Sequence, residues 1–275
     1  MKILIVTPLL LCSALSFADS QTNPTNWGDA FSNKRDAGGY FSIGLAVHNQ
    51  HGLYQPSDTE ADLIFSGAYY FENGLFAELP SHNDKFETSL TLGYNLANVG
   101  EWEFDTIYSY AHGSLQRGNV DFKEKTPYLG IRATGTIAGI DTMFSYGLNT
   151  NNKRYSNGHY AAAWFAKSWN VKNWYIYGSL GLQYRNSKML DYYYGVEQSD
   201  IYHTNYQADA GVNIIYKLGV KKPINEDWVV EGFFSYTDYA DSIIDSPYTQ
   251  NVLRYYDGDR SDKGRVLSLS INYVF

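Results

Sequence analysis

The sequence contains one cysteine, Cys12, which directly follows an apolar segment close to the start. Lys2 precedes this segment, which runs from Ile3 to Leu11, and Ser16-Phe17-Ala18 follows with the small residues that a signal peptidase reads. The segment is too short to span a bilayer, which needs about 20 residues. We therefore expect residues 1–18 to be cleaved as a signal peptide. Cys12 would leave with it, which excludes disulfides and thiolate metal sites from the mature chain.

Long apolar runs are lacking in the rest of the sequence, where Tyr160 to Ala166 is among the longest. No run there approaches the length of a membrane helix.

Basic residues are also too few to balance the acidic ones. Without Lys2, 20 basic residues face 29 acidic ones, which gives a formal charge of −9. This balance argues against a nucleic acid as the partner.

Tyrosine and glycine are abundant, with 26 and 24 residues, yet the mean hydropathy is negative. A transmembrane β-barrel reconciles these observations, because only every second strand residue meets lipid and aromatic residues collect at both interfaces. A secreted β-sandwich or propeller would share the composition. The segment Val266–Phe275 favours the barrel, because its apolar residues alternate with polar ones and an aromatic ends it. The expected signal for the barrel-assembly machinery consists of Leu269, Ile271, Tyr273 and Phe275.

The same alternation predicts an all-β fold, a transmembrane antiparallel up-and-down β-barrel over residues 38–275. We expect about twelve strands, within a range of roughly 10 to 14. Short connections alternate with long ones, as periplasmic turns alternate with extracellular loops in bacterial barrels. Residues 19–37 would form an N-terminal periplasmic segment. The predicted strands are 39–49, 62–71, 74–79, 86–97, 102–113, 126–137, 140–149, 159–169, 174–185, 206–218, 228–239 and 264–275.

Charged residues within these strands should face the lumen, because a basic residue at the lipid midplane costs about 2–4 kcal/mol. The lumen would then hold both signs of charge. It could be a salt-bridged, largely filled interior or a narrow hydrophilic conduit, and the size of the barrel favours the filled interior. The lumen-facing candidates are Glu87, Glu103, Asp105, Arg132, Asp141, Arg185, Asp209, Lys217 and Glu231.

Catalytic and metal-binding patterns are weak in this sequence. Arg154-Tyr-Ser-Asn-Gly-His159 is similar to a region of outer-membrane phospholipases, but Arg154 stands where their catalytic histidine lies. The general base is therefore missing. His159 could substitute for it, although an Asn-Gly turn that enters a strand is the simpler interpretation. The six histidines have no metal-ligand spacing, and the acidic residues of the last long loop lack the full calcium-loop pattern. We expect no enzyme, no cofactor and no metal centre.

Two motifs resemble a known family. The first, Ser187-Lys-Met-Leu-Asp-Tyr-Tyr-Tyr-Gly-Val196, follows a predicted central strand, and Asp245-Ser-Pro247 lies in the last long loop. With the C-terminal strand, these motifs look like the MltA-interacting protein (MipA)/OmpV family, over roughly residues 38–275. The resemblance implies a barrel in the outer membrane of a Gram-negative cell. For the named member it implies a scaffold between a lytic murein transglycosylase and a murein synthase. Members are also linked to adhesion and envelope permeability.

Three classes of function remain open. The first is a scaffold that docks murein transglycosylase or synthase, and the second is a narrow channel for small hydrophilic solutes. The third is a lipid-modifying enzyme that would depend on Ser156, and an adhesin is a further alternative. The other expected partners are membrane lipid, lipopolysaccharide and the barrel-assembly machinery. The candidates for an external contact are the loop tyrosines Tyr192, Tyr193 and Tyr194.

Overall fold

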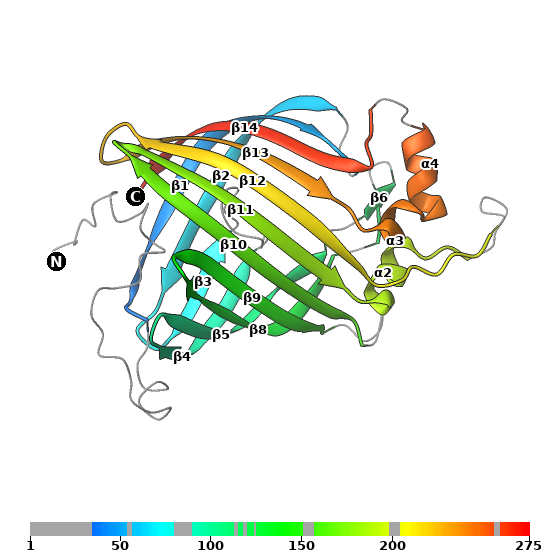
Figure 1. Cartoon of the computed structure of the whole chain (residues 1–275), viewed down its shortest axis with the longest axis horizontal. Coiled ribbons are helices and arrows are strands. Elements are labelled where there is room, and N and C mark those ends of the chain that lie inside the picture. Colours follow the sequence, from blue (N-terminus) through cyan, green and yellow to red (C-terminus); the bar gives the residue numbers. More distant parts are fainter. Residues whose placement is uncertain are drawn as a thin grey trace.

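The computed structural model is a closed antiparallel β-barrel, shown in Figure 1. It describes residues 35–53, 57–79, 90–112, 115–117, 120–123, 125–150, 157–197, 204–255 and 259–275. The predicted signal peptide, residues 1–18, lies outside these ranges, and so do residues 19–34 of the predicted periplasmic segment.

Twelve strands form the barrel, so the predicted number and the antiparallel topology are confirmed. Strands that follow one another in the chain are neighbours in the barrel, with one exception: β5 pairs with β8. Between these two in sequence lie β6 (Leu115–Arg117) and β7 (Val120–Lys123), which form a separate two-stranded sheet. The barrel strands are β1 (Gly38–His51), β2 (Asp58–Tyr70), β3 (Leu75–Leu79), β4 (Thr91–Val99), β5 (Trp102–His112), β8 (Thr126–Ile137), β9 (Ile140–Asn149), β10 (His159–Val171), β11 (Trp174–Arg185), β12 (Gly211–Pro223), β13 (Trp228–Asp238) and β14 (Lys263–Val274).

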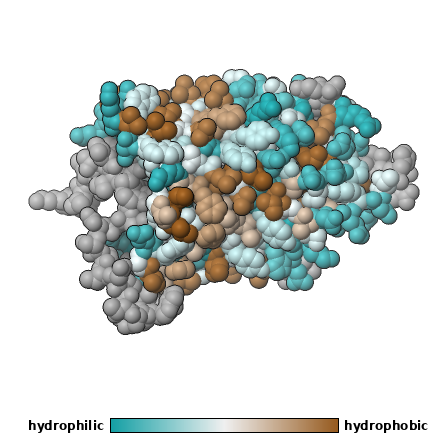
Figure 2. Space-filling model, in the orientation of Figure 1, coloured by the Kyte–Doolittle hydropathy of each residue, from teal (hydrophilic) through white to brown (hydrophobic). Residues whose placement is uncertain are grey.

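The first and last strands close the barrel. Their register runs from Ser42 opposite Val274 to His51 opposite Arg265. Along β14, Leu269 is 61% exposed on the outside, whereas the neighbouring serines and Asn272 are buried on the inside. The two-residue period of a strand therefore produces an apolar outer wall and a polar inner wall. Figure 2 shows hydrophobic residues gathered over the strands.

The two ends of the barrel differ in their connections. At one end, called the turn end, the connections are 71–74, 100–101, 138–139, 172–173 and 224–227. The two residues Ala138 and Gly139 both have positive φ, 52° and 71°, as a type I′ turn requires, and glycine adopts this conformation without strain. At the other end, called the loop end, lie the helices α2 (Ser187–Tyr194), α3 (Asp241–Ile244) and α4 (Pro247–Tyr255). Within the residues described, no helix is long and apolar enough to cross a membrane.

One strand begins later than the sequence predicted. The expectation was a start at 206, but β12 begins at Gly211. The chain before it is used differently: residues 187–194 are helical, and Val196 and Tyr206 form an isolated bridge. Asp209 therefore precedes the strand and is exposed, so its predicted position on the lumen wall is corrected. The start predicted for the fourth strand, 86–89, lies outside the described residues.

Tryptophan residues form a belt at the turn end. Trp102, Trp174 and Trp228 are the first residues of their strands, and Trp169 lies near the end of β10. The Trp228 ring lies edge-on to Tyr273, with the ring centroids 5.2 Å apart. Tryptophan and tyrosine suit the boundary between hydrocarbon and headgroups, because one part of the ring system is apolar and the other forms hydrogen bonds. The belt therefore marks the membrane interface at the turn end.

Candidate functional site

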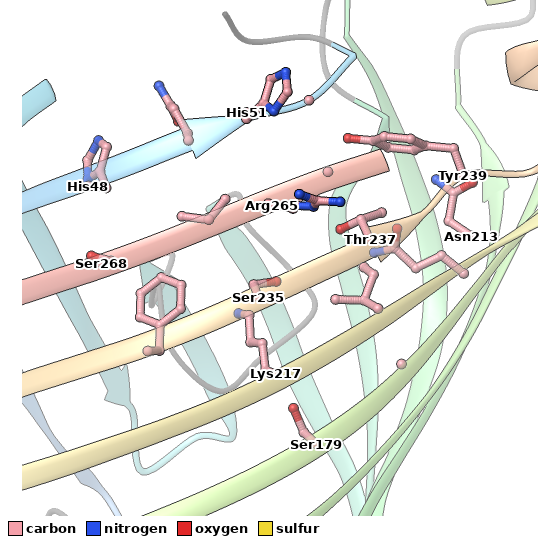
Figure 3. A pocket seen from close by; sticks show the side chains of 18 of the residues that line it. His48, His51, Ser179, Asn213, Lys217, Ser235, Thr237, Tyr239, Arg265 and Ser268 are labelled. Atoms are coloured by element: carbon pink, nitrogen blue, oxygen red, sulfur yellow. The ribbon is translucent and has the colours of Figure 1, made fainter. Parts of the chain in front are cut away.

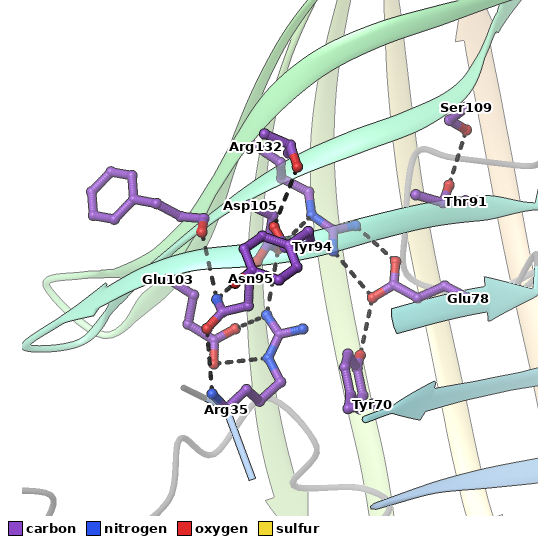
Figure 4. Close-up of polar contacts among 12 residues, drawn as sticks. Arg35, Tyr70, Glu78, Thr91, Tyr94, Asn95, Glu103, Asp105, Ser109 and Arg132 are labelled. Atoms are coloured by element: carbon purple, nitrogen blue, oxygen red, sulfur yellow. Dashed lines mark hydrogen bonds and ion pairs between the residues drawn. The ribbon is translucent and has the colours of Figure 1, made fainter. Parts of the chain in front are cut away.

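A cluster of charged and polar side chains lies inside the barrel near the turn end (Figure 4). We call it the turn-end cluster. Its members come from the segment before β1 and from β2, β3, β4, β5 and β8. They are Arg35, Tyr70, Glu78, Asn95, Glu103, Asp105 and Arg132.

Arg132 joins two carboxylates across the interior. It donates to Glu78 at 2.7 and 3.2 Å and to Asp105 at 3.1 and 3.3 Å. Asp105 and Arg132 are directly opposite in the β5–β8 register, so strand pairing brings them together. Arg132 is 4% exposed and Asp105 is fully buried. Such charges persist in a protein interior only when they are paired and hydrogen-bonded, as here.

Arg35 enters the same cluster from outside the strands. Its guanidinium donates to Glu103, lies 3.5 Å from an Asp105 oxygen, and lies 4.4 Å from the centre of the Tyr70 ring. Its backbone N–H donates to the Asn95 side chain at 3.3 Å. Burial alone would lower the pKa of Arg35, but the hydrogen bond and charge of Glu103 and the charge of Asp105 raise it above the ordinary value. The segment before β1 is thus held inside the turn end by a permanent charge.

The loop end is covered by α2 and α3, which we call the cap. The Asn186 side chain accepts a hydrogen bond from the Met189 N–H at 3.2 Å and begins α2. The Tyr193 ring stacks on His112 with centroids 3.8 Å apart, and the Tyr194 hydroxyl lies 3.0 Å from His112 Nε2. Ser246 donates its hydroxyl hydrogen to the Tyr194 carbonyl at 2.6 Å. The two sequence motifs that suggested the family therefore meet in the cap.

This arrangement corrects the prediction for the tyrosine loop. Tyr193 and Tyr194 are buried rather than available for an external contact, because α2 is amphipathic and turns them with Met189 and Leu190 toward the barrel. Tyr192 is half-buried, and the Lys123 ammonium lies 4.5 Å from the centre of its ring. Burial lowers the pKa of Lys123, against the opposing charges of two nearby acids.

A polar cavity of about 630 Å³ lies inside the barrel and is shown in Figure 3. Arg185 on its wall donates from Nε to the Ala111 carbonyl at 2.8 Å, and Lys217 lies 5.5 Å from the centre of the Phe233 ring. The negative charges come from β2, where the acidic residues Glu60 and Asp62 line the same cavity. The cavity therefore has a basic and an acidic wall.

The other predicted lumen residues are spread along the barrel. Glu231 is buried, 3.7 Å from Lys221 and 3.3 Å from the Tyr177 hydroxyl. Asp141 lies on the inner face of β9, on the same side as the buried Met143. Glu87 lies outside the described residues.

Sequence reasoning missed several residues of the interior. Glu78 could have been found, because it alternates with Leu75, Ala77 and Leu79 along β3. Arg35 gave no such signal, since it precedes the first strand. Sequence spacing gives the histidines no metal-ligand pattern, yet β1–β2 pairing places His48 opposite Glu60.

A model of the family described as MltA-interacting protein MipA matches residues 43–275. The outer membrane protein Omp26La of Vibrio anguillarum is 22% identical over 211 residues, covering 75% of this chain and 79% of that protein. Among solved structures, OmpT of Vibrio cholerae has a TM-score of 0.43 and 9% identity and covers 88% of this chain and 99% of its own. An anion-selective porin from Comamonas acidovorans has a TM-score of 0.38 and 8% identity, and the match covers 87% of this chain and 99% of the porin.

Proposed function

Because the chain belongs to the family described as MltA-interacting protein MipA and is an outer-membrane β-barrel, we propose that it is a structural docking protein. In this proposal its turn end faces the periplasm and binds enzymes that remodel murein. The family description names an interaction with MltA, and the proposal extends that interaction to this chain.

The observation that carries the proposal is the filled turn end. Arg132 and its two carboxylates are buried, and Arg35 inserts beside them from the N-terminal side. A wide porin keeps an aqueous channel through its lumen. A barrel with a salt bridge across its interior is better suited to hold a rigid surface in the membrane than to pass solutes.

The turns offer a charged surface for such a partner. Glu72, Glu101, Glu226 and Asp227 are exposed on three turns, which we call the acidic rim. The β2–β3 and β12–β13 turns flank the strands β1 and β14 that close the barrel, and the β4–β5 turn lies further around the rim, beyond β3. A cluster of one sign attracts a partner of the opposite sign and speeds encounter. The acidic rim therefore favours a partner with a basic surface.

The test is capture of murein enzymes from the envelope. The full chain is tagged, cross-linked in cells, extracted in detergent and analysed for murein transglycosylases and synthases. We expect the wild type to capture at least one of them, and the triple variant Glu72→Lys, Glu101→Lys, Glu226→Lys to lose it. The matched control reverses two exposed acids at the loop end, Glu197→Lys and Asp209→Lys, and should capture as the wild type does. Recovery of no murein enzyme with the wild type would overturn the proposal.

A narrow channel is the second candidate, and the polar cavity is the observation that favours it. Stepwise conductance of the refolded wild type in planar bilayers would support the channel, and a sealed bilayer would exclude it. Ser156, on which a lipid-modifying activity would depend, lies outside the described residues. Because Arg154 stands where the general base would be expected, we propose no enzymatic activity.

A further inference from the structure

Three side chains on the cavity wall form a group of the kind that binds metal ions. His48, Glu60 and Asp62 each offer one nitrogen or carboxylate oxygen, and these atoms all lie within 4.8 Å of one another. His48 Nε2 is 2.8 Å from an oxygen of Asp62. All three residues line the cavity, and Figure 3 shows His48 on its wall.

Strand pairing holds the group together. His48 is directly opposite Glu60 in the β1–β2 register, and Asp62 is opposite Ala46, two residues away on the same face. Side chains at such direct and diagonal positions are near neighbours on one side of a sheet. Ala46 is buried inside the barrel and Val47 is exposed outside, which confirms that this face is the inner one. The three ligand groups thus rest on two paired strands and not on loops, as a precise site requires.

Glu60 and Asp62 form no direct salt bridge with a basic side chain among the described residues other than the His48 imidazole. Glu60 accepts a hydrogen bond from Gln50 at 3.1 Å, and Asp62 contacts the imidazole. No lysine or arginine of the described chain forms a salt bridge with either carboxylate. Two carboxylates on one wall without a salt bridge to lysine or arginine favour a divalent cation. An imidazole in the set favours a transition-metal ion over Ca²⁺ or Mg²⁺, which prefer oxygen ligands only.

We propose that His48, Glu60 and Asp62 bind a divalent transition-metal ion such as Zn²⁺, with the remaining coordination positions open to the cavity. Bonds of about 2.0–2.2 Å to a tetrahedral ion place two ligand atoms roughly 3.4 Å apart. The present separations, 2.8 Å for one pair and at most 4.8 Å for any pair, bracket that value. Side-chain rotations that bring the ligand atoms closer by at most about 1.4 Å would therefore complete the site without movement of the strands.

Access and support are both present around this group. The Asp62 side chain is 55% exposed, so an ion in the cavity can reach it. The part of β2 that carries Glu60 and Asp62, residues 58–66, pairs only with β1 among the described residues, because β3 pairs with residues 67–70. The support for the two carboxylates therefore comes from β1. Gln50 orients the Glu60 carboxylate from behind, and such supporting hydrogen bonds change metal affinity by about 10- to 100-fold.

The test uses the full chain, purified in detergent, treated with EDTA and returned to metal-free buffer. Isothermal titration with ZnCl₂ should show one saturable site in the wild type. His48→Ala and Asp62→Asn should each abolish it, and Gln50→Ala should weaken it by at least about tenfold. The matched control is Asp58→Asn, which removes a carboxylate from the same strand but outside the group and should bind as the wild type does. Faster migration of unheated samples on SDS gels verifies that each variant is folded.

Cobalt supplies an independent readout. Co²⁺ bound through the imidazole should give visible absorption bands in the wild type that disappear in His48→Ala. Absence of saturable Zn²⁺ uptake by the wild type would overturn the proposal, and so would uptake retained in folded His48→Ala. The metal site can fail while murein-enzyme capture succeeds, because these residues face the cavity and the acidic rim lies on the turns.

Discussion

Replacement of Arg132 by methionine tests whether the turn-end cluster is a dry, ion-paired network. The change keeps most of the side-chain volume but removes four hydrogen bonds, two to Glu78 and two to Asp105. Breaking one side of a buried ion pair typically costs about 3–5 kcal/mol, because a charge remains buried without its partner. Here Asp105 keeps Asn95 at 2.9 Å, and Glu78 keeps the Tyr70 hydroxyl at 3.0 Å. We therefore expect the low end of the range, about 3 kcal/mol.

The assay is reversible urea unfolding of the barrel in lipid vesicles, followed by tryptophan fluorescence. Arg132→Met should lower the free energy of unfolding by about 3 kcal/mol, roughly two orders of magnitude in the unfolding equilibrium constant. The triple variant Arg132→Met, Glu78→Gln, Asp105→Asn should recover most of that loss, since no unpaired charge remains.

A matched control comes from the surface of the same protein. Lys188 is exposed on α2, and its change to methionine should stay within about 0.5 kcal/mol of the wild type. If Arg132→Met were as stable as this control, water would have to enter the cluster freely. The idea of a filled turn end would then be refuted.

Three further outcomes are expected. Arg35→Ala should raise the conductance of the refolded protein in planar bilayers, because it frees the segment before β1 from Glu103 and Asp105. An unchanged conductance would show that this contact does not limit the passage of ions. Tyr193→Ala should lower the free energy of unfolding by about 3–5 kcal/mol, as expected for a large buried aromatic that stacks on His112, and a loss below about 1 kcal/mol would contradict the packed cap. Leu269→Arg, on the outer wall of β14, should lower the free energy of unfolding in vesicles by about 2–4 kcal/mol. An unchanged free energy of unfolding in vesicles would contradict the assignment of this face to the membrane.

The strands could be predicted from the sequence because the barrel repeats one simple rule. Alternation along β14, β11 and β8 reports directly which side chains meet lipid, and each short turn carries its own local signal, as Ala138-Gly139 does. These features depend on neighbours in the chain. The inner charges of β5 and β8 followed from the same alternation, since a charged residue on the outer wall would be costly.

The cap and the interior contacts could not be predicted in this way. The segment 187–194 has tyrosines in succession, which suits a loop as well as a helix, and only its contacts with His112 and Ser246 fix it against the barrel. Arg35 has no periodic signal, because it lies outside the strands. The grouping of His48 with two acids depends on the register between strands, which sequence spacing alone does not specify.

The tryptophan distribution gives this protein a built-in reporter of direction. Of the five tryptophans that the structure describes, four stand on a single rim, and the fifth, Trp164, is buried inside the barrel. During insertion into vesicles, quenchers attached at chosen depths of the acyl chains would follow the arrival of that rim alone. Emission of Trp164 would change only when the interior closes. The order of those two optical events would reveal whether the wall enters the bilayer before or after it is sealed into a cylinder.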